Sequence, residues 1–288
     1  MSVLLFILGL AFGSFINVLA VRYEPDRWLV RRDILVGRSH CPHCGKVLSW
    51  FELVPLLSFI LQRGRCRQCH RKLSLQYPLA ELISGFIFVS VPYYFGHFYS
   101  SLILPGGSDP VYLSVFWIIV FLTLLLLSLI DFRLKLIPDE ISVFLTILGI
   151  LNISFLTKDF GLTGGSFAGP YALLFGFRNN VWQNHLLAAF LPAILLLALI
   201  IITRGRGMGM GDVKLVFALG LIFGWPDVII LLFFAFLLGS IVGVFAILAK
   251  RKTMKGALPF GPFMALGGLL VFWASRLVID FYFKTFNF

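Results

Sequence analysis

Long runs without a charged residue recur along this chain, and they constrain its fold more than any other feature. Eight such runs can be traced in the 288 residues. They cover residues 1–21, 82–108, 110–130, 141–157, 181–203, 215–226, 228–249 and 256–275. A helix needs about 20 apolar residues to cross the roughly 30 Å hydrocarbon layer of a bilayer. The runs therefore predict an all-α polytopic membrane protein with about eight transmembrane helices.

The composition agrees with a chain whose solvent is lipid. Hydrophobic residues make up 59% of the chain and charged residues only 13%, whereas a soluble domain carries about 25% charged residues. A soluble fold of this composition would lack a polar surface, so the soluble enzyme classes are excluded.

The sixth run is shorter than the others. As a helix, residues 215–226 would extend only about 18 Å at 1.5 Å per residue. Completing this span brings Gly211 and Asp212, which precede it, into the boundary of the membrane.

Positive charge alternates between the loops and predicts the topology. The loop 22–72 and the turns after the third, fifth and seventh runs hold 20 of the 24 Lys and Arg residues. Because Lys and Arg are retained in cytoplasmic loops, we expect these loops in the cytoplasm and both termini on the periplasmic side. The net charge of +11 is then explained by the excess of basic residues in the cytoplasmic loops of a membrane protein, and no nucleic acid is expected as a partner.

The same pattern divides the chain into three expected parts. Residues 1–21 form the first transmembrane helix, residues 22–77 a cytoplasmic zinc-binding loop, and residues 78–288 a seven-helix membrane domain. Residues 1–21 lack a basic start and continue into the basic loop, so a retained helix is favoured over a cleaved signal peptide. No role is predicted for the longer outer segments 96–110 and 158–180.

All four cysteines lie in the first loop as two Cys-x-x-Cys pairs, Cys41 with Cys44 and Cys66 with Cys69. Two such pairs about 20 residues apart can converge on one tetrahedral zinc ion. Disulfides or free thiols are the alternative, but thiols stay reduced in the cytoplasm. A zinc ribbon that binds nucleic acid is a weaker alternative, because few aromatic residues accompany the basic ones. Three nearby histidines could substitute for a cysteine, but because four cysteines fill the site they are expected to be bystanders or to support the ligands: His40, His43 and His70.

Five acidic residues lie near the predicted cytoplasmic ends of helices: Glu81, Asp131, Asp139, Glu140 and Asp212. An ionisable residue within a membrane span is costly and is usually functional. Each also has a plainer interpretation. Asp131 could pair with a neighbouring basic residue, Asp139 could cap or open the fourth helix, and Asp212 could lie in a solvated glycine-rich turn. The glycines before Asp212 do not predict a nucleotide site, because no strand precedes them and no Gly-Lys-Ser/Thr follows.

Asp131 and Asp212 are predicted to lie at similar depth on the same side of the membrane. Hydrolysis of a peptide bond by paired aspartates needs this arrangement: one ionised carboxylate activates water while the other, protonated, donates to the carbonyl oxygen. Close like charges in a low dielectric make such a pair share one proton. The sequence therefore predicts an intramembrane aspartyl protease with Asp131 and Asp212 as its catalytic residues.

Six segments, in order along nearly the whole chain, resemble the type IV prepilin peptidase family. They are GSFINV from Gly13, the CPHC and CRQC pairs, YPLAEL from Tyr77, Asp131 followed by LIPD at 136–139, GMGDVK from Gly209, and PFGPF from Pro259. A small departure follows Arg22, where this chain has Tyr23-Glu24-Pro25 and many members have Leu-Pro. It touches neither the cysteines nor the aspartates.

The resemblance implies a substrate and a second activity. Family members cut the short basic leader from prepilins or pseudopilins at the cytoplasmic face of the bacterial inner membrane, typically after a glycine. Many also methylate the new N-terminal amine with S-adenosylmethionine, and the cysteine loop is typical of the bacterial branch with both activities. The catalytic pair would again be Asp131 and Asp212. The supporting residues would be Asp139, Gly209, Gly211 and Lys214.

Two other classes of protein share parts of this pattern. Intramembrane carboxylates and interrupted helices also occur in transporters and channels, but no inverted repeat is present and an ion pathway does not need the cysteine loop. A membrane-anchored zinc scaffold without catalysis is the third possibility. It would tolerate mutation of the aspartates, which a protease would not.

Overall fold

The computed structural model describes residues 2–25, 29, 37–99, 110–159, 166–167, 180–205, 207–249 and 258–285. Over these residues the chain is helical, and its only β-structure is two isolated bridges in the cysteine loop. The chain forms two compact units. Unit 1 comprises Met1–Ser101 and Pro110–Ile130, and unit 2 comprises Leu102–Asp109 and Asp131–Phe288.

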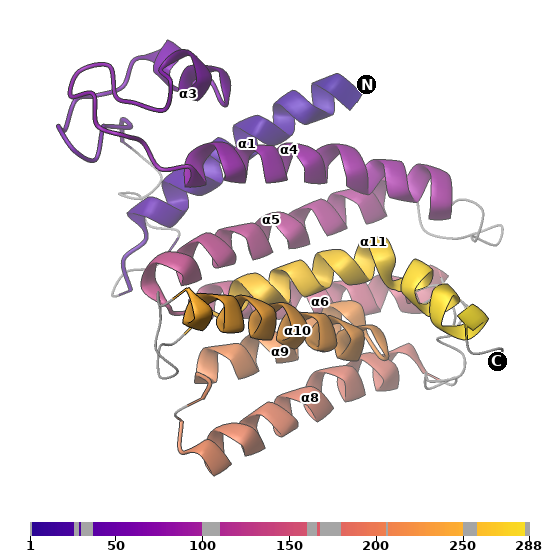
Figure 1. Cartoon of the computed structure of the whole chain (residues 1–288). Helices are drawn as coiled ribbons and strands as arrows, with labels where there is room; N and C mark the ends of the chain where they lie inside the picture. Colours follow the sequence, from indigo (N-terminus) through magenta and orange to yellow (C-terminus); the bar gives the residue numbers. More distant parts are fainter. Residues whose placement is uncertain are drawn as a thin grey trace. The chain divides into compact units, whose positions relative to one another are not determined.

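Eight long helices in the described residues correspond to the eight charge-free runs (Figure 1). They are α1 (Ser2–Arg22), α4 (Gln76–Tyr94), α5 (Pro110–Leu134), α6 (Asp139–Asp159), α8 (Val181–Thr203), α9 (Met210–Phe223), α10 (Asp227–Leu248) and α11 (Gly261–Thr285). Three short elements complete the described structure: η1 (Trp50–Glu52), α3 (Leu57–Leu61) and the π-helical turn η2 (Phe95–Tyr99). Five helices are long and apolar enough to cross a membrane, namely α1, α4 extended to His97, α5, α8 and α10. The predicted fold class is confirmed.

Several helix boundaries differ from the ends of the charge-free runs, and the start of α4 and the end of α11 are two of them. α4 begins at Gln76, six residues before the run 82–108, because Glu81 lies inside the helix and is buried there. α11 continues to Thr285, ten residues past the end of the run 256–275. A carboxylate that is buried with a hydrogen-bond partner does not end a helix. A helix can therefore begin before the charge-free run that marks it in the sequence.

In unit 1, α1 and α4 pack closely through small residues. A Cβ atom added to Gly9 would lie 2.7 Å from Gly85 Cα, and one added to Gly13 would lie 2.7 Å from Glu81 Cα. The backbones can approach this closely only because side chains are missing at the contact, as is common between membrane helices. The close contact sets the position of Glu81 and of the loop that joins the two helices.

In unit 2, α9 packs against both α6 and α8, while α10 packs against α11. Glycines make these contacts close as well: a Cβ atom at Gly149 of α6 would lie 2.7 Å from Leu221 Cβ, and one at Gly220 of α9 would overlap the carbonyl of Ala188. α9 has only 14 residues, about 21 Å at 1.5 Å per residue. Its residues from Leu215 to Phe223 are almost all buried, so a helix too short to span alone is enclosed by other helices. The helix begins at Met210 and so contains Gly211 and Asp212, while their place at the membrane boundary stays a prediction.

The end of α9 opposite Asp212 is fixed to α8 by polar contacts. Gly224 ends the helix with a φ of +73°, which glycine adopts without strain. The next residue, Trp225, donates its amide to Asn184 Oδ1 at 2.8 Å, and Asn184 Nδ2 donates to the Trp225 carbonyl at 3.0 Å. His185 Nδ1 lies 2.9 Å from the Leu221 carbonyl oxygen. These contacts hold α9 in place along its axis.

The outer segments 96–110 and 158–180 fall mostly outside the described residues. A described fragment of the second packs against the start of α10, where Asp227 is fully buried. The Asp227 carboxylate accepts hydrogen bonds from Ser166 Oγ at 2.9 Å and from the Phe167 amide at 2.8 Å. This carboxylate therefore has a structural environment within unit 2.

Candidate functional sites

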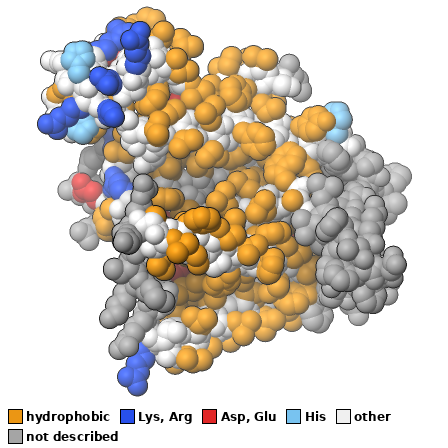
Figure 2. Space-filling model, in the orientation of Figure 1, with side chains coloured by type: hydrophobic (Ala, Val, Ile, Leu, Met, Phe, Trp, Pro, Cys, Tyr) orange, Lys and Arg blue, Asp and Glu red, His pale blue; other side chains and the backbone are white. Residues whose placement is uncertain are grey.

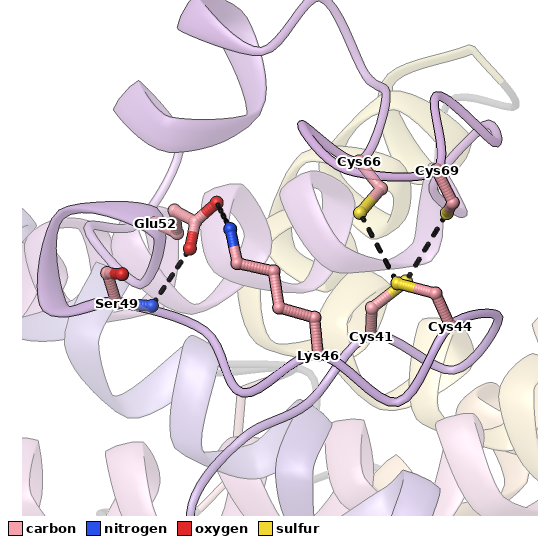
Figure 3. Close-up of polar contacts among 7 residues, drawn as sticks. All are labelled: Cys41, Cys44, Lys46, Ser49, Glu52, Cys66 and Cys69. Atoms are coloured by element: carbon pink, nitrogen blue, oxygen red, sulfur yellow. Dashed lines mark hydrogen bonds and ion pairs between the residues drawn. The ribbon is translucent and has the colours of Figure 1, made fainter.

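Four thiols converge in the cysteine loop of unit 1. The Sγ atoms of Cys41, Cys44, Cys66 and Cys69 all lie within 4.8 Å of one another. Two of the pairs, Cys41 with Cys69 and Cys44 with Cys66, are 4.0 Å apart, as Figure 3 shows. A tetrahedral site with Zn–S bonds of about 2.3 Å has S···S edges of about 3.8 Å. The cluster is therefore close to the size of a four-thiolate metal site, and the four predicted ligands come together.

The two cysteine pairs lie on equivalent backbone turns. The residue after each pair donates its amide back to the first cysteine of that pair, Gly45 to the Cys41 carbonyl and His70 to the Cys66 carbonyl, both at 3.0 Å. Both residues have positive φ, +70° at Gly45 and +53° at His70. Amide hydrogen bonds from Cys69 and Gln68 lower the pKa of the Cys66 thiol to about 6, whereas the pKa of the Cys44 thiol in the same cluster is raised to about 11. A thiolate is the metal-binding form, so Cys66 ionises before Cys44.

Glu52 connects the first cysteine turn to η1. Its buried carboxylate accepts the Ser49 amide at 2.9 Å and lies 3.5 Å from Lys46 Nζ, and both contacts are drawn in Figure 3. The hydrogen bond from Ser49, with the charge of Lys46 nearby, holds the pKa of Glu52 below its ordinary value. Of the nearby histidines, none contributes to the four-sulfur cluster in the described residues.

Asp131 lies on α5, one turn before the helix ends, and is only 3% exposed. Its Oδ2 atom accepts the backbone N–H of Gly261 at 2.9 Å. Gly261 is the first residue of α11, so the N-terminus of that helix, with its partial positive charge, is directed at the carboxylate. Gly261 belongs to the PFGPF segment, which sequence reasoning noted without assigning a role, since a contact across 130 residues leaves no local signal.

Asp212 lies in the first turn of α9, next to the other aspartate of the predicted pair. Its Oδ2 atom accepts the Gly209 amide at 3.1 Å. The carboxylates of Asp212 and Asp131 are near enough for their charges to interact. A Cβ atom at Gly211 would lie 3.0 Å from Ile137 Cβ, so this glycine permits close packing of α9 on the segment before α6. The structure thus brings together the two aspartates that the sequence predicted.

Two further predicted residues meet beside this pair. Asp139 is the first residue of α6, as expected for a residue that opens the fourth helix. Both of its carboxylate oxygens accept from Lys214 Nζ, at 2.7 and 2.8 Å. The ion pair is solvent-exposed and joins the start of α6 to the first turns of α9. Sequence reasoning selected both residues but did not predict that they pair.

Two family models match this chain. One, described as the bacterial peptidase A24 N-terminal domain, matches residues 7–95, and the other, described as the type IV leader peptidase family, matches residues 118–244. The first range contains all four cysteines, and the second contains both aspartates of the pair.

Curated relatives are similar over nearly the whole chain. The prepilin leader peptidase/N-methyltransferase of Bacillus subtilis (strain 168) is 30% identical over 282 residues, which cover 98% of this chain and 97% of the relative. The protein of the same name from Aeromonas hydrophila is 30% identical, with 95% and 91% covered. That from Burkholderia pseudomallei (strain K96243) is 33% identical, with 91% and 82% covered. No solved structure matches the chain significantly.

Proposed function

Because this chain belongs to the type IV leader peptidase family, we propose that it removes the basic leader from prepilins or pseudopilins and then N-methylates the new terminus. The observation that carries the cleavage reaction is the pairing of Asp131 with Asp212. Two carboxylates from different helices lie close enough to interact, and each is oriented by one backbone amide, from Gly261 and Gly209.

The two aspartates divide the work of hydrolysis. Close like charges in a protein interior are relieved when the pair holds one proton. The ionised carboxylate takes a proton from water as the water oxygen attacks the scissile carbonyl carbon, and the protonated one donates to the carbonyl oxygen. The C–N bond then breaks as the first carboxylate passes its proton to the leaving amine, while the second carboxylate takes back the proton from the former carbonyl oxygen. The two amides bind the Oδ2 atoms, so we assign the Oδ1 atoms to water and substrate.

The supporting residues fix the position of α9, and with it the position of Asp212 relative to Asp131. The ion pair between Lys214 and Asp139 joins α9 to α6, and Gly211 allows the close packing that sets the position of Asp212. An exposed ion pair contributes at most about 1 kcal/mol to stability. The proposed role of Lys214 and Asp139 is therefore to position α9, with a small effect on folding.

The family and the apolar helices indicate a bacterial inner membrane protein. We further propose that the cysteine loop and the aspartates lie on the cytoplasmic side and both termini on the periplasmic side. The reason is that 20 of the 24 basic residues fall in the loop 22–72 and in the turns after the third, fifth and seventh charge-free runs. A prepilin would place its apolar helix in the bilayer beside these helices and its basic leader in the cytoplasm.

We propose zinc as the metal of the four-cysteine site. Four cysteines with tetrahedral spacing fit a structural zinc site, which needs no open coordination position. The ion would be held by Cys41, Cys44, Cys66 and Cys69 and would join the two turns of the loop. The role of the ion is structural, with no part in cleavage.

We propose S-adenosylmethionine as the methyl donor and a cavity of unit 1 as its site. The cavity has a volume of about 290 Å³, just below the roughly 300–1,000 Å³ of small-molecule sites. Glu52, Glu81 and Asn17 line it, and the buried Asn17 Oδ1 accepts no hydrogen bond within the described structure. Carboxylates favour a cationic ligand. The bound donor supplies a methyl group on a positively charged sulfur, and these three residues would hold it.

The test of the cleavage reaction is hydrolysis of a purified prepilin in liposomes. The wild-type chain, Asp131→Asn, Asp212→Asn and the neighbouring control Glu140→Gln are compared, with folding checked by thermal unfolding. We expect the two aspartate variants to fold and to lose activity by at least about a hundred-fold, and the control to cut normally. Cleavage by a folded Asp131→Asn or Asp212→Asn variant would show that this pair is not catalytic, and Asp139 would become the next candidate.

The methyl donor is tested in the same vesicles. Asn17→Leu is expected to lose binding of S-adenosylmethionine in equilibrium dialysis while it still cuts the prepilin. If Asn17→Leu binds the donor normally, the cavity is not its site. If the wild type cuts no prepilin, the substrate class is wrong, and proton flux in these vesicles would support the transporter alternative.

A further inference from the structure

One side of the cysteine loop is strongly apolar and exposed. The helix α3 presents Leu57, Ile60 and Leu61 at positions i, i+3 and i+4, and these side chains are 58%, 69% and 67% exposed. Trp50 of η1, which packs beside α3, is 80% exposed. Residues at this spacing share one helix face. We call these four side chains the apolar face of the loop.

A hydrogen bond fixes the depth of this face relative to the membrane helices. The Leu56 amide, directly before α3, donates to Glu81 Oε2 at 2.8 Å. Glu81 lies five residues inside α4, which begins at Gln76, and five residues of helix extend about 7.5 Å. The residue before α3 is therefore held beside the second turn of α4, near the end where that helix is expected to enter the membrane.

The surface of α4 at this level is itself suited to lipid. Leu79 and Phe86 are 55% and 58% exposed, and Leu82 and Ile83 between them are also exposed. Figure 2 shows hydrophobic side chains on the side of the loop that adjoins these helices, while basic side chains gather at its outer end. The apolar face thus continues the lipid-facing surface of α4.

Positive charge borders the apolar face. Arg63 and Arg65 follow α3 within four residues, and both are exposed. Exposed Arg67, Arg71 and Lys72 follow further along the loop. Interfacial helices bury an apolar face about 5–10 Å into the headgroup boundary, with Lys and Arg toward anionic lipid headgroups and Trp at the interface. Both the depth of α3 and its charged border match this arrangement.

We propose that α3 and Trp50 form an interfacial anchor that inserts into the leaflet where α4 enters the membrane, with Arg63 and Arg65 on anionic lipid headgroups. The anchor holds the cysteine loop on the bilayer surface. Lipid phosphates then neutralise basic residues of the loop, which would otherwise repel a basic peptide near the membrane. The proposal does not depend on the peptidase reaction.

The test is fluorescence quenching of Trp50 in proteoliposomes made with brominated phosphatidylcholine and an anionic lipid. Spectra of the wild type and of Trp50→Phe are subtracted to give the Trp50 signal. We expect lipids brominated near the headgroups to quench the Trp50 fluorescence more strongly than lipids brominated deep in the acyl chains. We also expect acrylamide in the aqueous phase to quench it weakly. Equal quenching with and without bromine, together with full access to acrylamide, would overturn the anchor.

Matched variants separate the anchor from simple folding of the loop. Ile60→Ser combined with Leu61→Ser is expected to reduce lipid quenching of Trp50, while Val47→Ser, an exposed apolar residue of the loop outside the face, leaves it unchanged. Arg63→Gln with Arg65→Gln is expected to reduce quenching in anionic vesicles but not in neutral ones. Zinc content confirms that each loop is folded. A Trp50 signal that is shielded only after a prepilin is added would assign the face to a protein partner and overturn the proposal.

Discussion

The cysteine loop of unit 1 and the aspartate pair of unit 2 are built in opposite ways. In the loop, four ligands come from two short turns with the same backbone hydrogen bonds, Gly45 to Cys41 and His70 to Cys66. In the pair, Asp131 and Asp212 come from helices far apart in the sequence and depend on amides and packing from other elements. A local motif carries its geometry within the sequence, whereas a site made from helix ends exists only after the helices pack.

Removal of one cysteine should have the largest effect, and only on unit 1. We expect Cys66→Ser to lose the proposed zinc ion nearly completely, because structural zinc sites contribute about 10–16 kcal/mol in small domains. Metal analysis gives the stoichiometry, and limited proteolysis of the loop gives its fold. His43→Ala, an exposed neighbour, is the control and should keep the metal. Unfolding of the helices of unit 2 in Cys66→Ser would contradict the independence of the two sites.

The amide of Gly261 offers the sharpest test of the aspartate pair. Gly261→Pro removes the N–H group that Asp131 accepts at the first position of α11, where proline is tolerated. A hydrogen bond to a charged group contributes about 1.5–3 kcal/mol, so we expect prepilin cleavage to fall by roughly ten- to a hundred-fold. Gly261→Ala keeps the N–H group and should lose less. Equal loss in both variants would mean that packing matters at this position and the hydrogen bond does not.

Gly211 tests how tightly α9 must be placed. Its Cβ atom in Gly211→Ala would lie 3.0 Å from Ile137 Cβ, and the resulting small shift of Asp212 should slow cleavage about ten-fold, since misplacement by 1 Å costs about a hundred-fold. Gly207→Ala is the control, because its nearest contact would be an ordinary 3.7 Å. The rates of both variants are measured on one prepilin. A normal cleavage rate in Gly211→Ala would mean that Ile137 can move away from the added Cβ atom without displacing Asp212.

The smallest expected effect is a pH dependence confined to the loop. The pKa of Glu52 is lower in the folded loop than its ordinary value, so its contribution to stability is present above about pH 4.3 and is lost as the pH falls through the folded pKa. Hydrogen exchange of the Ser49 amide should be faster in Glu52→Gln than in the wild type at neutral pH. This difference should shrink as the solution is acidified, and a difference independent of pH would contradict the assignment.

Much of the fold and both sites could be predicted from local features. The membrane forces helices about 20 residues long, so charge-free runs located all eight. The two Cys-x-x-Cys pairs predicted a cluster that the structure brings together. The scarcity of acidic residues at membrane depth selected Asp131 and Asp212. The division into residues 1–21, 22–77 and 78–288 stays a prediction.

Contacts between distant elements could not be predicted in this way. The bond from Gly261 to Asp131, the ion pair of Lys214 with Asp139 and the bond from Leu56 to Glu81 each join elements whose approach depends on packing. Every residue type except proline carries the same backbone N–H group, so its use as a donor leaves no trace in the sequence. The charge-free run 82–108 begins six residues after the start of α4 for a related reason, since Glu81 is buried with a partner that lies in another segment.

The length of α9 sets the direction in which Asp212 points relative to Asp131. The helix is fixed at its far end, where the Asn184 side chain accepts from the Trp225 amide and donates to the Trp225 carbonyl, and Asp212 lies at the other end. One residue inserted between these points would advance Asp212 by about 1.5 Å and rotate it by about 100° around the helix axis. Asp212 would then point away from Asp131 although every residue that contacts the pair is unchanged. The number of residues in this short buried helix is thus as much a part of the proposed active site as the carboxylates themselves.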